Sequence, residues 1–349
     1  MKREMAQDAD ELRSRTTELW NTLSGGRTGS FFPPLAGAAV SLSYARFGEL
    51  FGQGVSISDD DVWALYSLPH ETVHLVQAIT SPWFFEFNRD LTRMAMWAAH
   101  HQSRGEQLPS EMKAKFKTLQ ATMTAKVDGF SAHEILETQA VIEGFWGAMT
   151  RPNPSAVVYA ARERYPTDSL YLHILNLLVE SYGDGIAVEL GPRLCAIALQ
   201  SDQPGGLMAD ILSALSAAKG SIRKIHEMSL EDLLKSSRLD PHTMSRSYRE
   251  RGGATARDSA DAWFPFVMSA YFDRYEKLDV HARLTTMMHP GHIADYAPAS
   301  RTDFLPMYAL FENGLPVDLQ RSTRNETDFA RWVDIGLAIT EGIRWLSEV

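Results

Sequence analysis

Apolar residues recur at helical spacing along most of this chain, and this periodicity is the feature that most restricts its fold. Met112, Phe116, Leu119 and Met123 form the i, i+4, i+7, i+11 stripe of an amphipathic helix. Similar patterns predict further helices, at residues 131–149, 167–185, 206–220, 229–234 and 327–349. The chain is therefore predicted to be mainly helical.

Strand candidates are few and lie near the N-terminus. Residues 38–47 and 54–58 are rich in β-branched and aromatic residues and are expected to pair across an intervening turn. Residues 28–37 are expected to be a break between elements. These patterns predict a small N-terminal β-hairpin or sheet beside the helices.

Two regions differ in character from the rest of the chain. Residues 1–27 are expected to be an N-terminal helical segment, followed by one mainly helical domain over residues 28–349. Within that domain, residues 238–260 form a long polar stretch with five arginines. Loops of this length in compact domains are unusual, so we expect a mobile surface loop here, with a substrate-covering lid as the alternative.

Composition excludes several classes of protein. A nucleic-acid-coating surface needs clustered Lys and Arg, so the net charge of -10 argues against such a partner. The single cysteine, Cys195, permits neither an intramolecular disulfide nor a cysteine-rich zinc site, and its apolar surroundings predict a buried thiol. Neither a signal peptide nor an apolar run of membrane-spanning length is found. We therefore expect a cytoplasmic protein without a membrane partner, its oligomeric state left open.

The segment SLPHETVHLVQAIT, residues 67–80, contains the candidate chemistry. Residues four apart lie on the same face of a helix, so His70 and His74 can direct their imidazoles at one cation. Glu71 is rotated by about 100° from His70, which places it beside a water on that cation. Such a water loses a proton readily, and a neighbouring carboxylate can accept it as general base.

A catalytic zinc usually has three protein ligands, so a third is expected from another helix. Glu137 is the best candidate because its face continues through Ala140, Gly144 and Ala148, small residues that allow a close approach. Glu143 is the competitor, about a third of a turn off that face.

Three further residues are weaker candidates. His133 lies one turn before Glu137 and could act as a ligand, a ligand partner or a transition-state donor. Tyr182 is another candidate donor. Glu180 is expected to be a buried carboxylate that needs a partner in space, such as His133 or the site itself.

HETVH at residues 70–74, followed by ETQA at residues 137–140, resembles the gluzincin class of zinc metallopeptidases. HETVHLVQ together with ETQAVIEGFWGA is similar to the ImmA/IrrE-like minimal metallopeptidases. The resemblance implies a zincin-like helical core with zinc on His70, His74 and Glu137, and Glu71 as general base. Because 62 residues separate His74 from Glu137, more than those peptidases usually have there, we expect inserted helices between the two motifs.

Pro69, directly before the motif, departs from the pattern of that class. Proline lacks an N–H and its ring clashes with the preceding turn, so it is comfortable in the first turn of a helix. We therefore predict a helix start or a kink at residues 67–69.

The leading hypothesis is a zinc hydrolase that cleaves an amide bond in a peptide or small molecule. The alternative is a non-haem iron enzyme with Fe²⁺, because two histidines and one carboxylate also form the facial triad of oxygenases. ETVH is moreover the E-x-x-H element of di-iron sites, with Glu71 then a ligand and HEILE, residues 133–137, supplying more. A third hypothesis is a catalytically silent sensor.

Overall fold

A computed structural model shows a mainly helical protein with a small sheet, as the sequence predicts. The expected N-terminal strands are joined in that sheet by two strands from residues 308–318. The structure describes most of the chain, namely residues 2–24, 29–32, 37–50, 58–149, 152–199, 201–217, 308–312, 316–318 and 326–348. The chain divides into two compact units. The first comprises Met1–Leu75, Asn88–Thr118 and Thr302–Val349, and the second comprises Val76–Phe87 and Leu119–Arg301.

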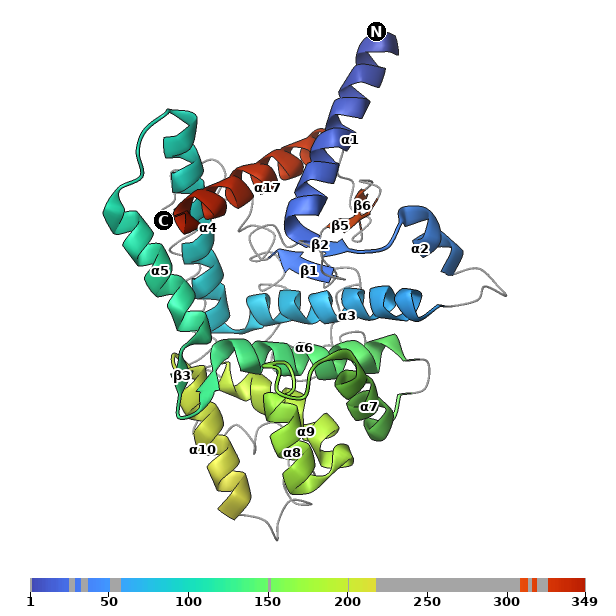
Figure 1. The fold of residues 1–349 in the computed structure, drawn as a ribbon, viewed down its shortest axis with the longest axis vertical. Helices are drawn as coiled ribbons and strands as arrows, with labels where there is room; N and C mark the ends of the chain where they lie inside the picture. The colour runs from blue at the N-terminus through green and yellow to red at the C-terminus, as the bar shows by residue number, and fades with distance from the viewer. Residues whose placement is uncertain are drawn as a thin grey trace. The chain divides into compact units, whose positions relative to one another are not determined.

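The first unit combines helices with a mixed sheet. Its helices are α1 (Lys2–Ser24), α2 (Tyr44–Leu50), most of α3 (Asp59–Thr80), most of α4 (Pro82–Ser103), the start of α5 (Ser110–Thr124) and α17 (Glu326–Ser347). The strands are β1 (Gly29–Phe32), β2 (Gly37–Val40), β5 (Tyr308–Phe311) and β6 (Pro316–Asp318), in the order β1-β2-β5-β6. Only the β2–β5 pair is parallel. Helix α1 packs against α17 and against β1, β2 and β5 (Figure 1).

Apolar packing holds the first unit together at two places. Phe116 of α5 is fully buried with Ala98 of α4 and Leu346 of α17. At the sheet, a β-carbon on Gly37 would overlap the buried ring of Trp332, so only glycine allows β2 to approach α17 this closely.

The second unit is built around one buried helix. Its helices are the end of α3, the start of α4, the end of α5, α6 (Ala132–Ala148), α7 (Pro154–Arg164), α8 (His173–Tyr182), α9 (Asp184–Ala198) and α10 (Pro204–Ala217). Helix α9 packs against α6, α7, α8 and α10, and most of its side chains are buried. A β-carbon on Gly191 would lie only 3.0 Å from the Ile142 side chain and 3.4 Å from that of Leu178, so glycine allows α9 to pack close to α6 and α8.

A short β-hairpin with a two-residue turn leads into α6. Strands β3 (Lys126–Val127) and β4 (Phe130–Ser131) pair across Asp128 and Gly129, which have φ values of 50° and 95°. Two consecutive residues with positive φ are typical of a type I′ turn, for which Asp-Gly is a preferred sequence. Ser131 then caps α6: its hydroxyl accepts from the Glu134 backbone N–H, and Glu134 accepts from the Ser131 backbone N–H.

Several predicted boundaries are corrected. Residues 28–37 contain strand β1 rather than a break, and the strand predicted at 38–47 ends at Val40 and gives way to α2, because Tyr44–Leu50 is helical. The helix predicted at 167–185 begins only at His173, since turns occupy the residues before it. Helices α4 and α5 do lie between the two motifs, as expected. The 54–58 pairing, the 229–234 helix and the 238–260 loop fall outside the described residues, apart from Ser58.

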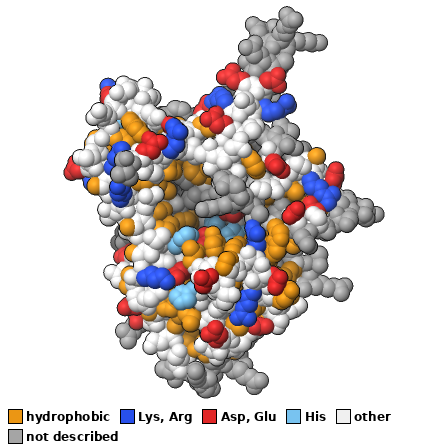
Figure 2. All heavy atoms as spheres, viewed as in Figure 1, with side chains coloured by type: hydrophobic (Ala, Val, Ile, Leu, Met, Phe, Trp, Pro, Cys, Tyr) orange, Lys and Arg blue, Asp and Glu red, His pale blue; other side chains and the backbone are white. Residues whose placement is uncertain are grey.

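The surface of the described residues mixes both signs of charge. On the face in Figure 2, Lys and Arg side chains alternate with Asp and Glu side chains, and neither sign gathers into one patch there. None of the helices within the described ranges combines the length and the apolar character needed to cross a bilayer.

Candidate metal centre

His70, Glu71 and His74 come together on α3 as their spacing predicts. All three side chains are buried, and each offers a ligand atom within 4.8 Å of those of the other two. The two imidazole rings lie almost perpendicular, with centroids 4.9 Å apart. Within the described residues, no other three metal-ligating side chains meet this distance. The chain therefore contains a buried His–Glu–His group that could hold a metal ion.

The donor set fits a divalent transition metal. Zinc binds histidine nitrogen and carboxylate oxygen at about 2.0–2.2 Å, so two ligands at a tetrahedral angle lie about 3.4 Å apart. The ligand atoms of this group lie within 4.8 Å of one another, so they would have to move closer together to meet on one ion. Two neutral imidazoles with one carboxylate would suit zinc or iron, whereas magnesium and calcium prefer oxygen ligands throughout.

Tyr66 orients the first histidine and was not identified from the sequence. Its hydroxyl lies 2.8 Å from Nδ1 of His70, and both side chains are buried. A metal-bound histidine usually donates its other ring N–H to an oxygen, which fixes the tautomer and the ring orientation. With Nδ1 engaged by the phenol, Nε2 would be the nitrogen that binds a metal. The signal was a tyrosine one turn before His70 on the same helical face.

Helix α3 does not begin at Pro69, as one alternative predicted. It starts at Asp59 and runs through the proline to Thr80. Ser58 provides the start signal: Ser58 and Asp61 exchange hydrogen bonds in the manner of a capping box. Two hydrogen bonds from Arg46 hold the pKa of the Asp61 carboxyl well below its usual range. The other alternative, a kink at residues 67–69, stays a prediction.

The second predicted ligand helix is α6. Glu137 is largely buried, and its Oε1 lies 3.3 Å from Nε2 of His133, so these two residues share a face as expected. Glu143 is buried on the same helix. The roles of Glu137, Glu143 and His133 at a metal stay predictions.

Helix α8 does not bury Glu180, contrary to the prediction. Glu180 is exposed, so the predicted buried carboxylate is wrong there. Ile174, Leu175 and Leu178 occupy the buried face of α8, and Glu180 projects from the other side. Tyr182 is half-buried at the last residue of the helix, and its role as a donor stays a prediction.

A second Glu–His group lies in the second unit, centred on buried Glu134. Its carboxylate accepts hydrogen bonds from Ser131, from Lys126 Nζ at 2.8 Å and from His173 Nδ1 at 3.0 Å. Burial alone would raise the pKa of this carboxyl, but the hydrogen bonds from Lys126 and Ser131 outweigh burial and leave the pKa lowered. These contacts make Glu134 part of the cap of α6.

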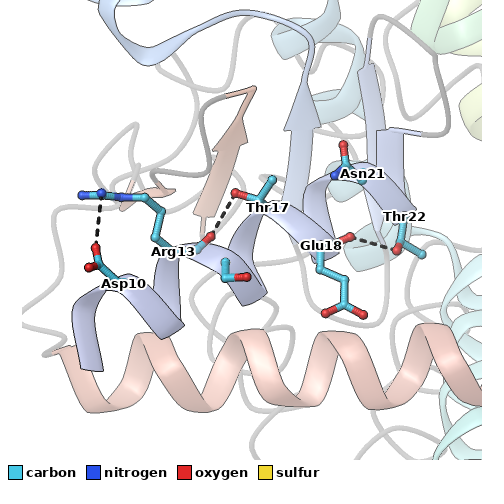
Figure 3. Close-up of a pocket in the computed structure, with 7 residues that line it drawn as sticks. Asp10, Arg13, Thr17, Glu18, Asn21 and Thr22 are labelled. Carbon is cyan, nitrogen blue, oxygen red and sulfur yellow. Dashed lines mark hydrogen bonds and ion pairs between the residues drawn. The ribbon is translucent and has the colours of Figure 1, made fainter. Parts of the chain in front are cut away.

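Neither the thiol of Cys195 nor a polar hollow along α1 offers a metal-binding or nucleophilic site. Cys195 is buried as predicted, and burial raises the pKa of its thiol far above the range of a nucleophile. A polar hollow lies along α1, where Asp10 pairs with Arg13 and the hydroxyls of Thr17 and Thr22 bond to backbone carbonyls of the same helix (Figure 3). These polar groups satisfy one another within the helix.

Comparison with known proteins adds no relative. No protein-family model, no curated protein and no solved structure matches this chain. The likeness to gluzincins therefore rests on the His70–Glu71–His74 group, and any function has to be argued from the residues themselves.

Proposed function

We propose that this protein is a metal-dependent hydrolase, of zinc metallopeptidase type, that cleaves an amide bond in a peptide or a small molecule. The observation that carries this proposal is the buried His70–Glu71–His74 group, with its ligand atoms within 4.8 Å of one another. Burial of three such polar side chains is costly unless they are paired or coordinate a metal.

Glu137 is the proposed third ligand. Its side chain is 13% exposed, and Ala140 and Gly144, one and two turns further along the same face, are buried small residues. His133, paired with Glu137, would hold that carboxylate in one rotamer, as carboxylate ligands are commonly held by a neighbouring donor.

The roles of the residues follow from their chemistry. Zinc, when bound, would acidify a coordinated water and polarise the substrate carbonyl. Glu71 accepts the proton of that water and later delivers it to the leaving amine. Tyr66 keeps His70 in the tautomer that presents Nε2. Tyr182 would donate a hydrogen bond to the oxyanion of the tetrahedral intermediate, with His133 as the alternative donor in place of its role beside Glu137.

One observation favours a second candidate, a non-haem iron oxygenase. A carboxylate oxygen of Glu71 belongs to the same close group as both imidazoles, so Glu71 has the reach to ligate a metal directly. Direct ligation by Glu71 and His74 is the E-x-x-H arrangement of helical di-iron sites. In that case Glu71 would be a ligand and not a base.

Metal analysis of four purified proteins tests the proposal. Wild type is expected to bind one zinc per chain, His74→Ala and Glu137→Ala to lose it, and Glu71→Gln to retain it while losing hydrolysis of an amide substrate by about 10²–10⁴-fold. Loss of metal from Glu71→Gln, together with iron in the wild type, would favour the oxygenase. A wild type without metal, whose stability is unchanged by chelators, would refute both and leave a silent sensor.

A further inference from the structure

Gln77 follows His74 by three residues on α3, and its amide is buried against α6. The residue is 2% exposed, and Nε2 donates to the Leu136 carbonyl at 2.9 Å and to Gln139 Oε1 at 3.0 Å. Both N–H groups of the amide therefore have an acceptor on α6. These contacts all lie within the second unit.

A buried amide with two acceptors on a neighbouring helix fixes the register of the two helices, here α3 and α6. Leaving it without partners costs about 1–3 kcal/mol, so the two helices favour the one arrangement in which both acceptors are in place. A shift of α6 by one turn would move the acceptors by about 5.4 Å, far beyond hydrogen-bonding distance. Gln77 thus resists sliding and rotation of α6 against the last turns of α3.

The two acceptors flank the proposed third ligand. Leu136 and Gln139 stand one residue before and two residues after Glu137 on α6. We propose that Gln77 is a positioning residue, which holds the Glu137 segment in register with the last turns of α3. This inference rests on the proposed function. Metal–ligand distances tolerate deviations of only about 0.2 Å, so a link that fixes the helix register matters directly for metal affinity.

The test compares Gln77→Ala with Ser81→Ala. Ser81, just past the end of α3, is also buried and also donates to a backbone carbonyl, but to Leu199 and not to α6. Zinc affinity is measured by competition with a chromophoric chelator, and thermal unfolding is measured on the metal-free proteins. Gln77→Ala is expected to bind zinc about 10–100-fold more weakly, whereas Ser81→Ala is expected to lose stability and keep its affinity.

Thermodynamic coupling distinguishes positioning from general loosening. Glu137→Ala is expected to be purified without zinc but to bind added zinc weakly through His70 and His74. In that background, Gln77→Ala should cause no further loss of zinc affinity, because no third ligand remains to be positioned. Should Gln77→Ala fail to fold, Gln139→Leu removes one of the two acceptors from the other side. It is expected to weaken zinc binding by about 3–10-fold, half of the effect in free energy.

The outcomes separate the two proposals. If wild type binds zinc and His74→Ala abolishes binding, but neither Gln77→Ala nor Gln139→Leu changes the affinity, the positioning role is overturned and the metal site stands. An equal loss in the wild-type and Glu137→Ala backgrounds overturns it too. If wild type binds no zinc, the proposed function fails and takes this inference with it.

Discussion

Two of the Glu–His groups among the described residues each contain a buried glutamate, but they are built differently. In the first unit, Glu71 stands with His70 and His74 on one helix, within a single turn. In the second unit, Glu134 accepts hydrogen bonds from residues on β3, β4 and α8, three separate elements.

The difference lies in which donor and acceptor atoms each group brings together. Glu134 receives four hydrogen bonds, two from Ser131 and one each from Lys126 and His173, which match the four acceptor sites of a carboxylate. Its charge is compensated by the chain itself. The group around Glu71 instead brings two imidazole nitrogens and a carboxylate oxygen together, which is the donor set of a cation. The first arrangement caps a helix, and the second could hold a metal ion.

The largest expected difference between the two groups concerns metal. A ligand present at a thousandfold excess over its Kd stabilises the folded state by about 4 kcal/mol. Zinc at such an excess should therefore raise the free energy of unfolding of wild type by about 4 kcal/mol, and that of His173→Ala equally. His74→Ala should show no gain. Urea denaturation with zinc and with chelator measures this gain in the free energy of unfolding. A gain that persists in His74→Ala would mean that zinc binds at another site.

Removing Glu134 is expected to have the next largest effect, on stability alone. Glu134→Ala leaves the Ser131 N–H, Lys126 and His173 without their acceptor and breaks the capping box of α6. Loss of a cap costs about 1 kcal/mol and an orphaned buried donor about 1–3, so a total near 2–3 kcal/mol is expected.

Urea denaturation of the metal-free proteins measures that loss. Glu163→Ala, at an exposed carboxylate of α7, is the control and should change stability by less than about 0.5 kcal/mol. Zinc affinity of Glu134→Ala should remain that of wild type. A variant that loses zinc as readily as His74→Ala would show that the two groups are not independent.

The same contrast explains how much of the site could be predicted. The His70–Glu71–His74 group depends on residues within one turn, so helical geometry alone predicted it. The start of α6 was predictable for the same reason, since Ser131 and Glu134 are three residues apart. Pro69 favoured a later start for α3 than the one observed, because a proline is best tolerated in the first turn of a helix. Ser58 and Asp61, which carry an ordinary capping pattern, mark the true start.

Contacts between distant segments were less accessible. Lys126 reaches Glu134 only because Asp128 and Gly129 turn the chain into a hairpin. Asp-Gly is a typical sequence for such a turn, so this hairpin could have been predicted. His173 lies 39 residues from Glu134, and nothing in the sequence links the two. The same holds for Gln77 and Gln139, which are 62 residues apart. Such pairs are selected by tertiary packing, which no local pattern encodes.

Tyr66 offers a finer test of the metal group. Tyr66→Phe removes the hydroxyl that contacts His70 Nδ1 and keeps the ring, so packing against His70 is retained. The imidazole then loses its fixed tautomer and orientation, and zinc affinity is expected to fall by about tenfold, about 1.4 kcal/mol. Chelator competition measures the change. An unaltered affinity would mean that the hydrogen bond serves only the packing of α3.

The smallest expected effect is the pH dependence of the Glu134 group. The folded-state pKa of Glu134 is lowered, so the ionised carboxylate stabilises the fold at pH values above the ordinary carboxyl pKa. This contribution is lost as the pH falls through the lowered folded-state pKa. Lys126 is 56% exposed and His173 37% exposed, so water screens much of the attraction and the effect stays modest.

Glu134→Gln isolates this contribution from that of other carboxylates. Glutamine is also accepted at this position of a capping box but cannot ionise, so it mimics the protonated side chain at every pH. The difference in unfolding free energy between wild type and Glu134→Gln should therefore be largest near neutral pH and shrink on acidification, measured by urea denaturation in chelator. A difference that stays constant with pH would mean that the shape of the cap, and not its charge, stabilises α6. The contrast with the metal group would then rest on geometry alone.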